Sequence, residues 1–93
     1  MARGDDLISV GFFRNETDRA MVLYLEMLAE EVHLSPGDAV ELLAVADPDL
    51  LPLTIDLVDD GLQIHAHKAI DPRWHVRFEG RLIPAGWPTK LRE

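Results

Sequence analysis

The stretch that most constrains the fold runs from Leu53 to His67, where two runs of alternating apolar and polar residues meet at Asp60-Gly61. Alternation with a period of two is typical of a strand that buries one face. An Asp-Gly pair between two such runs predicts a β-hairpin, because these residues accept the positive backbone dihedrals of a tight turn. We therefore expect residues 53–67 to form a hairpin that turns at Asp60 and Gly61.

This turn also predicts the register, because it pairs Leu57 with Ile64 and Asp56 with His65. A slip of one residue would send every side chain to the opposite face. The predicted inward residues are Leu53, Ile55, Leu57, Leu62, Ile64 and Ala66. The predicted outward residues are Thr54, Asp56, Gln63, His65 and His67.

A long helix is predicted from Glu16 to His33, a region without Gly or Pro in which most residues are good helix formers. Its apolar residues recur at helical spacing, and they are Met21, Tyr24, Leu25, Leu28 and Val32. Asn15 can cap this helix, and Glu16 and Asp18 place negative charge in its first turn.

Further strands are predicted before and after the helix. Leu7–Phe13 is rich in strand formers. Residues 39–46 fit a strand that follows a Pro-Gly turn, and they also fit a helix that begins near Ser35; we favour a strand over Val40–Val45. The alternation of Trp74–Glu79 predicts another strand, and a tight turn at Glu79-Gly80 leads into the next.

These elements predict a single α+β domain over residues 1–93, in the order strand, helix, strands. One long helix would pack on an antiparallel β-sheet of about five strands. Pro84, Gly86 and Pro88 predict an extended C-terminal tail over residues 84–93, which covers a sheet edge or stays mobile. A chain of 93 residues buries roughly two thirds of its unfolded surface, which is enough for one modest core.

The formal net charge is −8 and cysteine is absent. Because phosphate neutralisation needs a basic footprint, this charge excludes a conventional nucleic-acid binder and favours a protein partner with a basic surface. The lack of cysteine excludes disulfides and thiolate zinc sites. No apolar run has the form of a signal peptide or a membrane helix, so we expect a cytoplasmic protein that does not contact a membrane.

The candidate partner-binding residues are carboxylates and one tryptophan. The predicted helix carries Glu26, Glu30 and Glu31, and the predicted turns carry Asp47, Asp49, Asp59 and Asp60. Trp87 lies in the tail, where it either clamps the tail onto the body or is offered to a partner.

A second interpretation is a metal- or small-ligand-binding domain that uses histidines on the outward sheet face. His65 and His67 lie two residues apart, so a strand would place both side chains on one side, about 7 Å apart. The residues of this predicted ligand face are Asp56, His65, His67, His75 and Arg77. The competing explanation is a solvated strand face with a local Asp56–His65 contact.

We do not expect an enzyme, because no serine or threonine lies in a nucleophile motif and the glycines are scattered singly. We predict no metal and no cofactor. The sequence favours a small acidic protein-protein interaction module, with the profile of an inhibitor, an immunity protein or a phage-type decoy. A homodimer would help to stabilise so small a domain.

Overall fold

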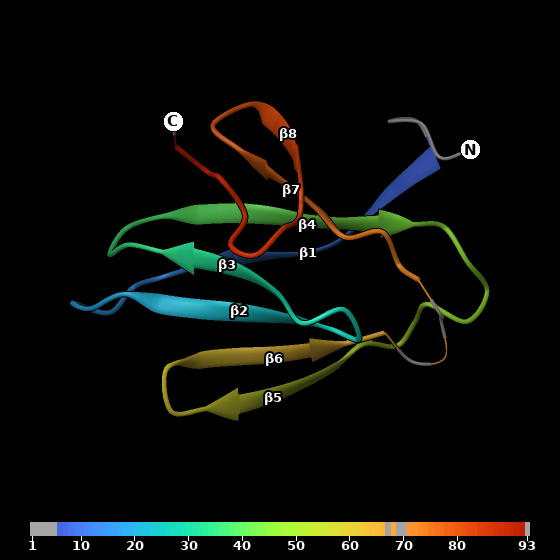
Figure 1. Cartoon of the computed structure of the whole chain (residues 1–93), viewed down its shortest axis with the longest axis horizontal. Coiled ribbons are helices and arrows are strands. Elements are labelled where there is room, and N and C mark those ends of the chain that lie inside the picture. Colours follow the sequence, from blue (N-terminus) through green and yellow to red (C-terminus); the bar gives the residue numbers. More distant parts are fainter. Residues whose placement is uncertain (1–5, 67, 69–70, 93) are drawn as a thin grey trace.

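The computed structural model describes residues 6–66, 68 and 71–92, and its regular structure consists of eight β-strands (Figure 1). The strands are β1 (Leu7–Arg14), β2 (Met21–Glu26), β3 (Glu30–Leu34), β4 (Ala39–Val45), β5 (Thr54–Val58), β6 (Gly61–His65), β7 (His75–Phe78) and β8 (Arg81–Pro84). They form two four-stranded sheets with the orders β1-β4-β7-β8 and β3-β2-β6-β5. All pairs of neighbours are antiparallel except β2 and β6, which are parallel.

The predicted helix over Glu16–His33 is wrong, and with it the α+β class. The segment forms the β2–β3 hairpin, in which Leu23 pairs with Val32 and a turn spans residues 27–29. The apolar residues of β2 satisfy both periods, because residues 21 and 25 fit a helix while residues 21, 23 and 25 fit a strand. Helix propensity is a weak preference that tertiary packing overrides, and here the strand buries Leu23 and Leu25 completely or nearly so.

The predicted hairpin over residues 53–67 is present as β5 and β6, but its turn is Asp59-Asp60 and Val58 pairs with Gly61. Leu57 therefore faces Leu62 instead of Ile64. Asp56 faces Gln63 instead of His65. The register differs from the predicted one by two residues, so the paired residues of β5 and β6 keep their predicted side of the sheet. Ile55 and Leu57, which were predicted to point inward, are nevertheless exposed, because β5 is the edge of the sheet.

Gly61 fixes this register through its contact with β2. It pairs with Val22, and the Val22 N–H donates to the Asp60 carbonyl oxygen at 2.8 Å. A β-carbon on Gly61 would lie 1.8 Å from the Val22 carbonyl oxygen. The positive φ values of glycine occur at Gly37 and Gly80 and not at Gly61, so Gly61 serves close approach of two strands and not the turn.

The other predicted strands are confirmed. β1 and β4 pair along their length, so the strand interpretation of residues 39–46 is correct. Glu79 and Gly80 form the β7–β8 turn with φ of 50° and 82°. The alternation of Trp74, Val76 and Phe78 corresponds to three buried side chains.

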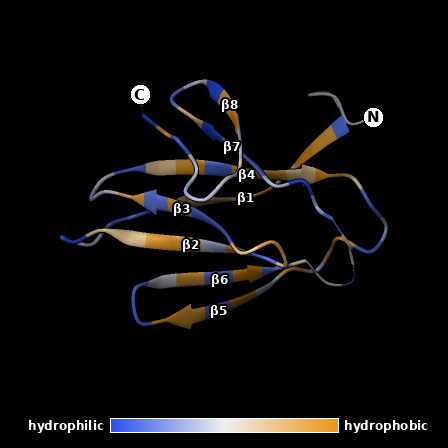
Figure 2. Cartoon of the chain, viewed as in Figure 1, coloured by the Kyte–Doolittle hydropathy of each residue, from blue (hydrophilic) through white to orange (hydrophobic). Residues whose placement is uncertain are grey.

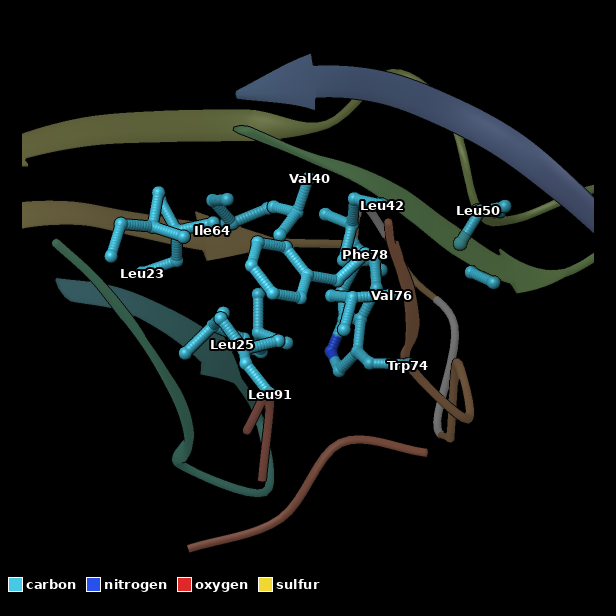
Figure 3. Close-up of a cluster of buried hydrophobic side chains, with 14 residues drawn as sticks. Leu23, Leu25, Val40, Leu42, Leu50, Ile64, Trp74, Val76, Phe78 and Leu91 are labelled. Atoms are coloured by element: carbon cyan, nitrogen blue, oxygen red, sulfur yellow. The ribbon is translucent and has the colours of Figure 1, made fainter. Parts of the chain in front are cut away.

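The core lies between the two sheets (Figure 3). Leu23, Leu25 and Ile64 come from one sheet, and they meet side chains of the other sheet and of the loops, namely Val40, Leu42, Leu50, Trp74, Val76, Phe78 and Leu91. The Trp74 indole N–H donates to the Glu26 carbonyl oxygen at 2.9 Å, so the largest buried side chain also joins the sheets through a hydrogen bond.

The tail pairs with the free edge of β3. The Glu31 N–H donates to the Gly86 carbonyl oxygen at 2.9 Å, and the Thr89 N–H donates to the Glu31 carbonyl oxygen at 2.7 Å. These two bonds occupy backbone groups that an edge strand would otherwise leave open.

The Gly61→Ala substitution tests the close approach of β6 to β2. We expect it to lower the free energy of unfolding by about 3 kcal/mol or more, because the added methyl group overlaps backbone that cannot rotate away. Gly80→Ala is the matched control, since nothing lies within 4 Å of its β-carbon position and only its positive φ opposes alanine. That control should lose about 1–2 kcal/mol in urea unfolding, and equal losses in the two variants would contradict the assignment.

Candidate interaction surface

The outer face of the β3-β2-β6-β5 sheet gathers polar side chains into rows. Because Leu23 and Leu25 point into the core, Tyr24 between them points outward. The four strands lie side by side in the order β3, β2, β6 and β5 (Figure 1). Their register forms one row across the sheet, made of Glu31, Tyr24, Gln63 and Asp56. Four carboxylates belong to this surface, which we call the acidic face: Glu26, Glu31, Asp56 and Asp60.

Neutral side chains hold two of these carboxylates in place. The Tyr24 hydroxyl donates to Asp60 Oδ2 at 2.6 Å, and the Gln63 amide donates to Glu26 Oε2 at 3.2 Å. The contact of Tyr24 with Asp60 raises the pKa of the tyrosine to about 12, first through this hydrogen bond, then through burial and the charges of Asp60 and Glu31. The phenol therefore remains a donor at neutral pH.

Histidines accompany the other two carboxylates. His33 Nε2 lies 2.8 Å from Glu31 Oε1, and His65 Nε2 lies 3.8 Å from Asp56 Oδ2. In the described part of the chain, no lysine or arginine forms an ion pair with any carboxylate of the acidic face. The described lysines and arginines therefore do not neutralise the negative charge of this face by ion pairing.

The predicted partner-binding carboxylates are divided among three places. Glu26, Glu31 and Asp60 lie on the acidic face, and Asp59 is exposed beside Asp60 in the same turn. The exposed residues Asp47 and Asp49 belong to the loop after β4, where Asp47 Oδ1 accepts the Asp49 N–H at 2.7 Å. Glu30 is buried and offers nothing to a partner.

The predicted ligand face does not come together as one surface. Asp56 and His65 lie on the acidic face, whereas His75 and Arg77 belong to β7 in the other sheet, where Arg77 Nε donates to Glu41 Oε1 at 3.2 Å. His67 lies outside the described residues. Within the described residues, no group of three or more His, Cys, Asp or Glu is placed to hold a metal ion.

Trp87 both clamps the tail and remains exposed. Its indole N–H donates to the Leu28 carbonyl oxygen at 2.8 Å, which ties the tail to the β2–β3 turn. Its side chain is nevertheless 67% exposed, and Met27 in the adjoining turn is 64% exposed. These two residues place exposed apolar surface close to Glu26, at the end of β2.

Sequence reasoning missed the environment of Glu30, which is only 7% exposed and whose Oε1 has no hydrogen-bond partner. Burial raises the pKa of this carboxyl group, the charge of Asp71 raises it further, and His75 lowers it. A period of two that places residue 30 on the same face as Val32 and Leu34 was the signal that could have revealed it.

The comparisons with known proteins give no relative: no protein-family model matches the chain, and neither a curated protein nor a solved structure shows detectable similarity. Among the described residues, no helix is long and apolar enough to span a membrane. Function must therefore be inferred from the surface itself.

Glu30→Gln tests the buried carboxyl group through the pH dependence of stability. The folded protein binds this proton more tightly than the unfolded chain does. The stabilisation is therefore complete below the ordinary pKa of 4.5 and is lost as the pH rises through the raised value. We expect urea unfolding of Glu30→Gln to lack this loss, so that the variant gains stability relative to wild type with rising pH. Exposed Glu79→Gln should track wild type, and parallel curves for all three proteins would refute the assignment.

Proposed function

We propose that the protein is a small, non-enzymatic interaction module that binds a basic segment of another protein on the acidic face. The observation that carries this proposal is the set of four carboxylates on one sheet face without a lysine or arginine partner among the described residues. A net charge of −8 acts in the same direction, since it attracts cationic partners over long range.

The hydrogen bonds within the acidic face favour binding of a partner. Tyr24 and Gln63 orient Asp60 and Glu26 before any partner arrives. Side chains that are already ordered lose less conformational entropy on association. The exposed ring of Trp87 and the exposed Met27 add apolar contact area at the Glu26 end, where a partner can exclude water.

Binding of this kind would block a basic surface of the partner. An inhibitor or an immunity protein would act in this way, and so would a decoy whose carboxylates take the place of nucleic-acid phosphates. The partner in this proposal is a protein and not nucleic acid, because phosphates would be repelled by the acidic face. The cytoplasmic location and the homodimer remain predictions.

The double variant Glu31→Gln/Asp56→Asn tests this function with an oligolysine peptide as the probe. We expect its affinity for the peptide to be about fivefold weaker than that of wild type, because an exposed ion pair contributes about 0.2–1 kcal/mol. The difference should shrink at high salt. Titration calorimetry measures the affinity, and the NMR shifts of backbone amides locate the site.

The matched control is Asp18→Asn/Glu79→Gln, which also removes one aspartate and one glutamate charge, but at exposed positions outside the acidic face. Its affinity should stay within about twofold of wild type if the arrangement of the charges matters. Equal losses in both double variants, with amide shifts spread over the whole surface, would show that the carboxylates only keep the protein soluble.

A further inference from the structure

The edge strand β5 lacks the protection that the other three sheet edges have. All five of its residues are exposed, and in the described part of the chain only β6 pairs with it. Leu57 is 87% exposed and Ile55 is 47% exposed, and Figure 2 shows hydrophobic residues along this strand. An exposed edge that carries apolar residues is a template on which another strand can pair.

The other edges are each blocked by a specific device. The tail covers β3 through the bonds of Glu31 with Gly86 and Thr89. β8 has four residues and ends in Pro84, which has no N–H. β1 contains a register shift between Ser9 and Gly11, and such a bulge disturbs the edge. Among the described strands, β5 is therefore the edge that lacks such a device.

The hairpin register determines which backbone groups of β5 are free. Hydrogen-bonded and non-bonded pairs alternate along an antiparallel ladder. Because Val58 and Gly61 close a two-residue turn and form a bonded pair, Asp56 also bonds to β6. Ile55 and Leu57 then direct their N–H and C=O groups away from the sheet, toward an incoming strand.

The two sides of β5 differ in chemistry. Asp56 points to the acidic face, whereas Leu57 points to the opposite side together with its pair partner Leu62. On that side Leu62 borders a cleft of about 190 Å³, which Phe13 and Met21 also line. A strand added to β5 would therefore meet carboxylates on one side and apolar surface on the other.

We propose that β5 binds an extended segment of a partner protein in which basic and apolar residues alternate, by antiparallel strand addition. This inference rests on the proposed function and specifies the partner's chemistry. The basic residues lie opposite Asp56 on the side of the acidic face, and the apolar residues pack beside Ile55 and Leu57. Alternation follows from the strand period of two.

A second copy of this chain is a poorer occupant of the edge. In the antiparallel register with full overlap, Asp56 faces the Asp56 of the other copy across a non-bonded pair. Cα atoms in such a pair are about 4.5 Å apart. Like charges in this position are destabilising. The basic residues of a cationic strand would instead be attracted to Asp56.

The test uses three peptides with the same numbers of lysine and valine residues. One peptide alternates the two residues, one groups them in blocks, and one alternates them with N-methyl groups on every valine. In antiparallel addition the valines lie opposite Ile55 and Leu57, so their N–H groups face β5 and methylation removes these hydrogen bonds. We expect the alternating peptide to bind at least about tenfold more tightly than the other two.

A fourth peptide with N-methyl groups on the lysines provides the internal control. Its methylated nitrogen atoms point away from β5. We therefore expect this peptide to bind with the same affinity as the unmodified alternating peptide. The reverse result, in which only lysine methylation abolishes binding, would overturn the antiparallel arrangement in favour of a parallel strand. Equal affinity of all four peptides would overturn strand addition, while continued sensitivity to Glu31→Gln/Asp56→Asn would leave the proposed function standing.

Protein variants give a separate readout. Leu57→Lys places a cation on the apolar side of the edge. We expect it to lower the affinity for the alternating peptide at least about fivefold. Phe12→Lys is the matched control, because Phe12 is 79% exposed on β1 and should have no effect. A solution mass that shows a dimer in wild type and in Phe12→Lys, but a monomer in Leu57→Lys, would assign the edge to a second copy and overturn the proposal.

Discussion

The parallel contact of β6 with β2 at Gly61 and Val22 holds the rest of one sheet in place. It joins two hairpins that are distant in sequence, β2–β3 and β5–β6, into one four-stranded sheet. Because only a residue without a β-carbon fits against the Val22 carbonyl oxygen, the turn shifts to Asp59-Asp60. Asp60 then accepts both the Val22 N–H and the Tyr24 hydroxyl, so the same contact builds the centre of the acidic face.

The hairpin prediction was partly correct for a reason that lies in the strand period. The Asp-Gly signal suggested a turn at residues 60–61, and the close approach to Val22, which no local pattern reveals, moved it to residues 59–60. Since the shift is two residues, Asp56 and His65 remained on the predicted outward side. The acidic face is thus half predictable from the sequence, because the pattern around Glu26 and Glu31 predicts a helix where the structure has the β2–β3 hairpin.

The helix prediction is wrong because the apolar residues in 21–33 fit both the helical period and the strand period of two. Their propensities favour a helix in isolation. In this fold the segment instead forms two strands, and every second residue packs into the core between the sheets. Glu30 shows the limit most clearly, since the helical interpretation placed it in water and the sheet places it beside Val32 and Leu34 on the inner face. Trp74, Val76 and Phe78 could be predicted because their alternation fits no competing helix.

The distribution of cations explains why the acidic face is available to a partner. Arginines pair with carboxylates elsewhere in the fold, in the pairs Arg14–Glu16, Arg77–Glu41 and Arg92–Asp38. Among the described residues, the only basic side chains paired with carboxylates of the acidic face are the histidines His33 and His65. With 17 acidic and 9 basic residues, the chain cannot neutralise every carboxylate by its own ion pairs. Four of the remaining carboxylates lie on the sheet whose edge strand β5 pairs only with β6 among the described strands. Both features favour the same cationic, extended partner.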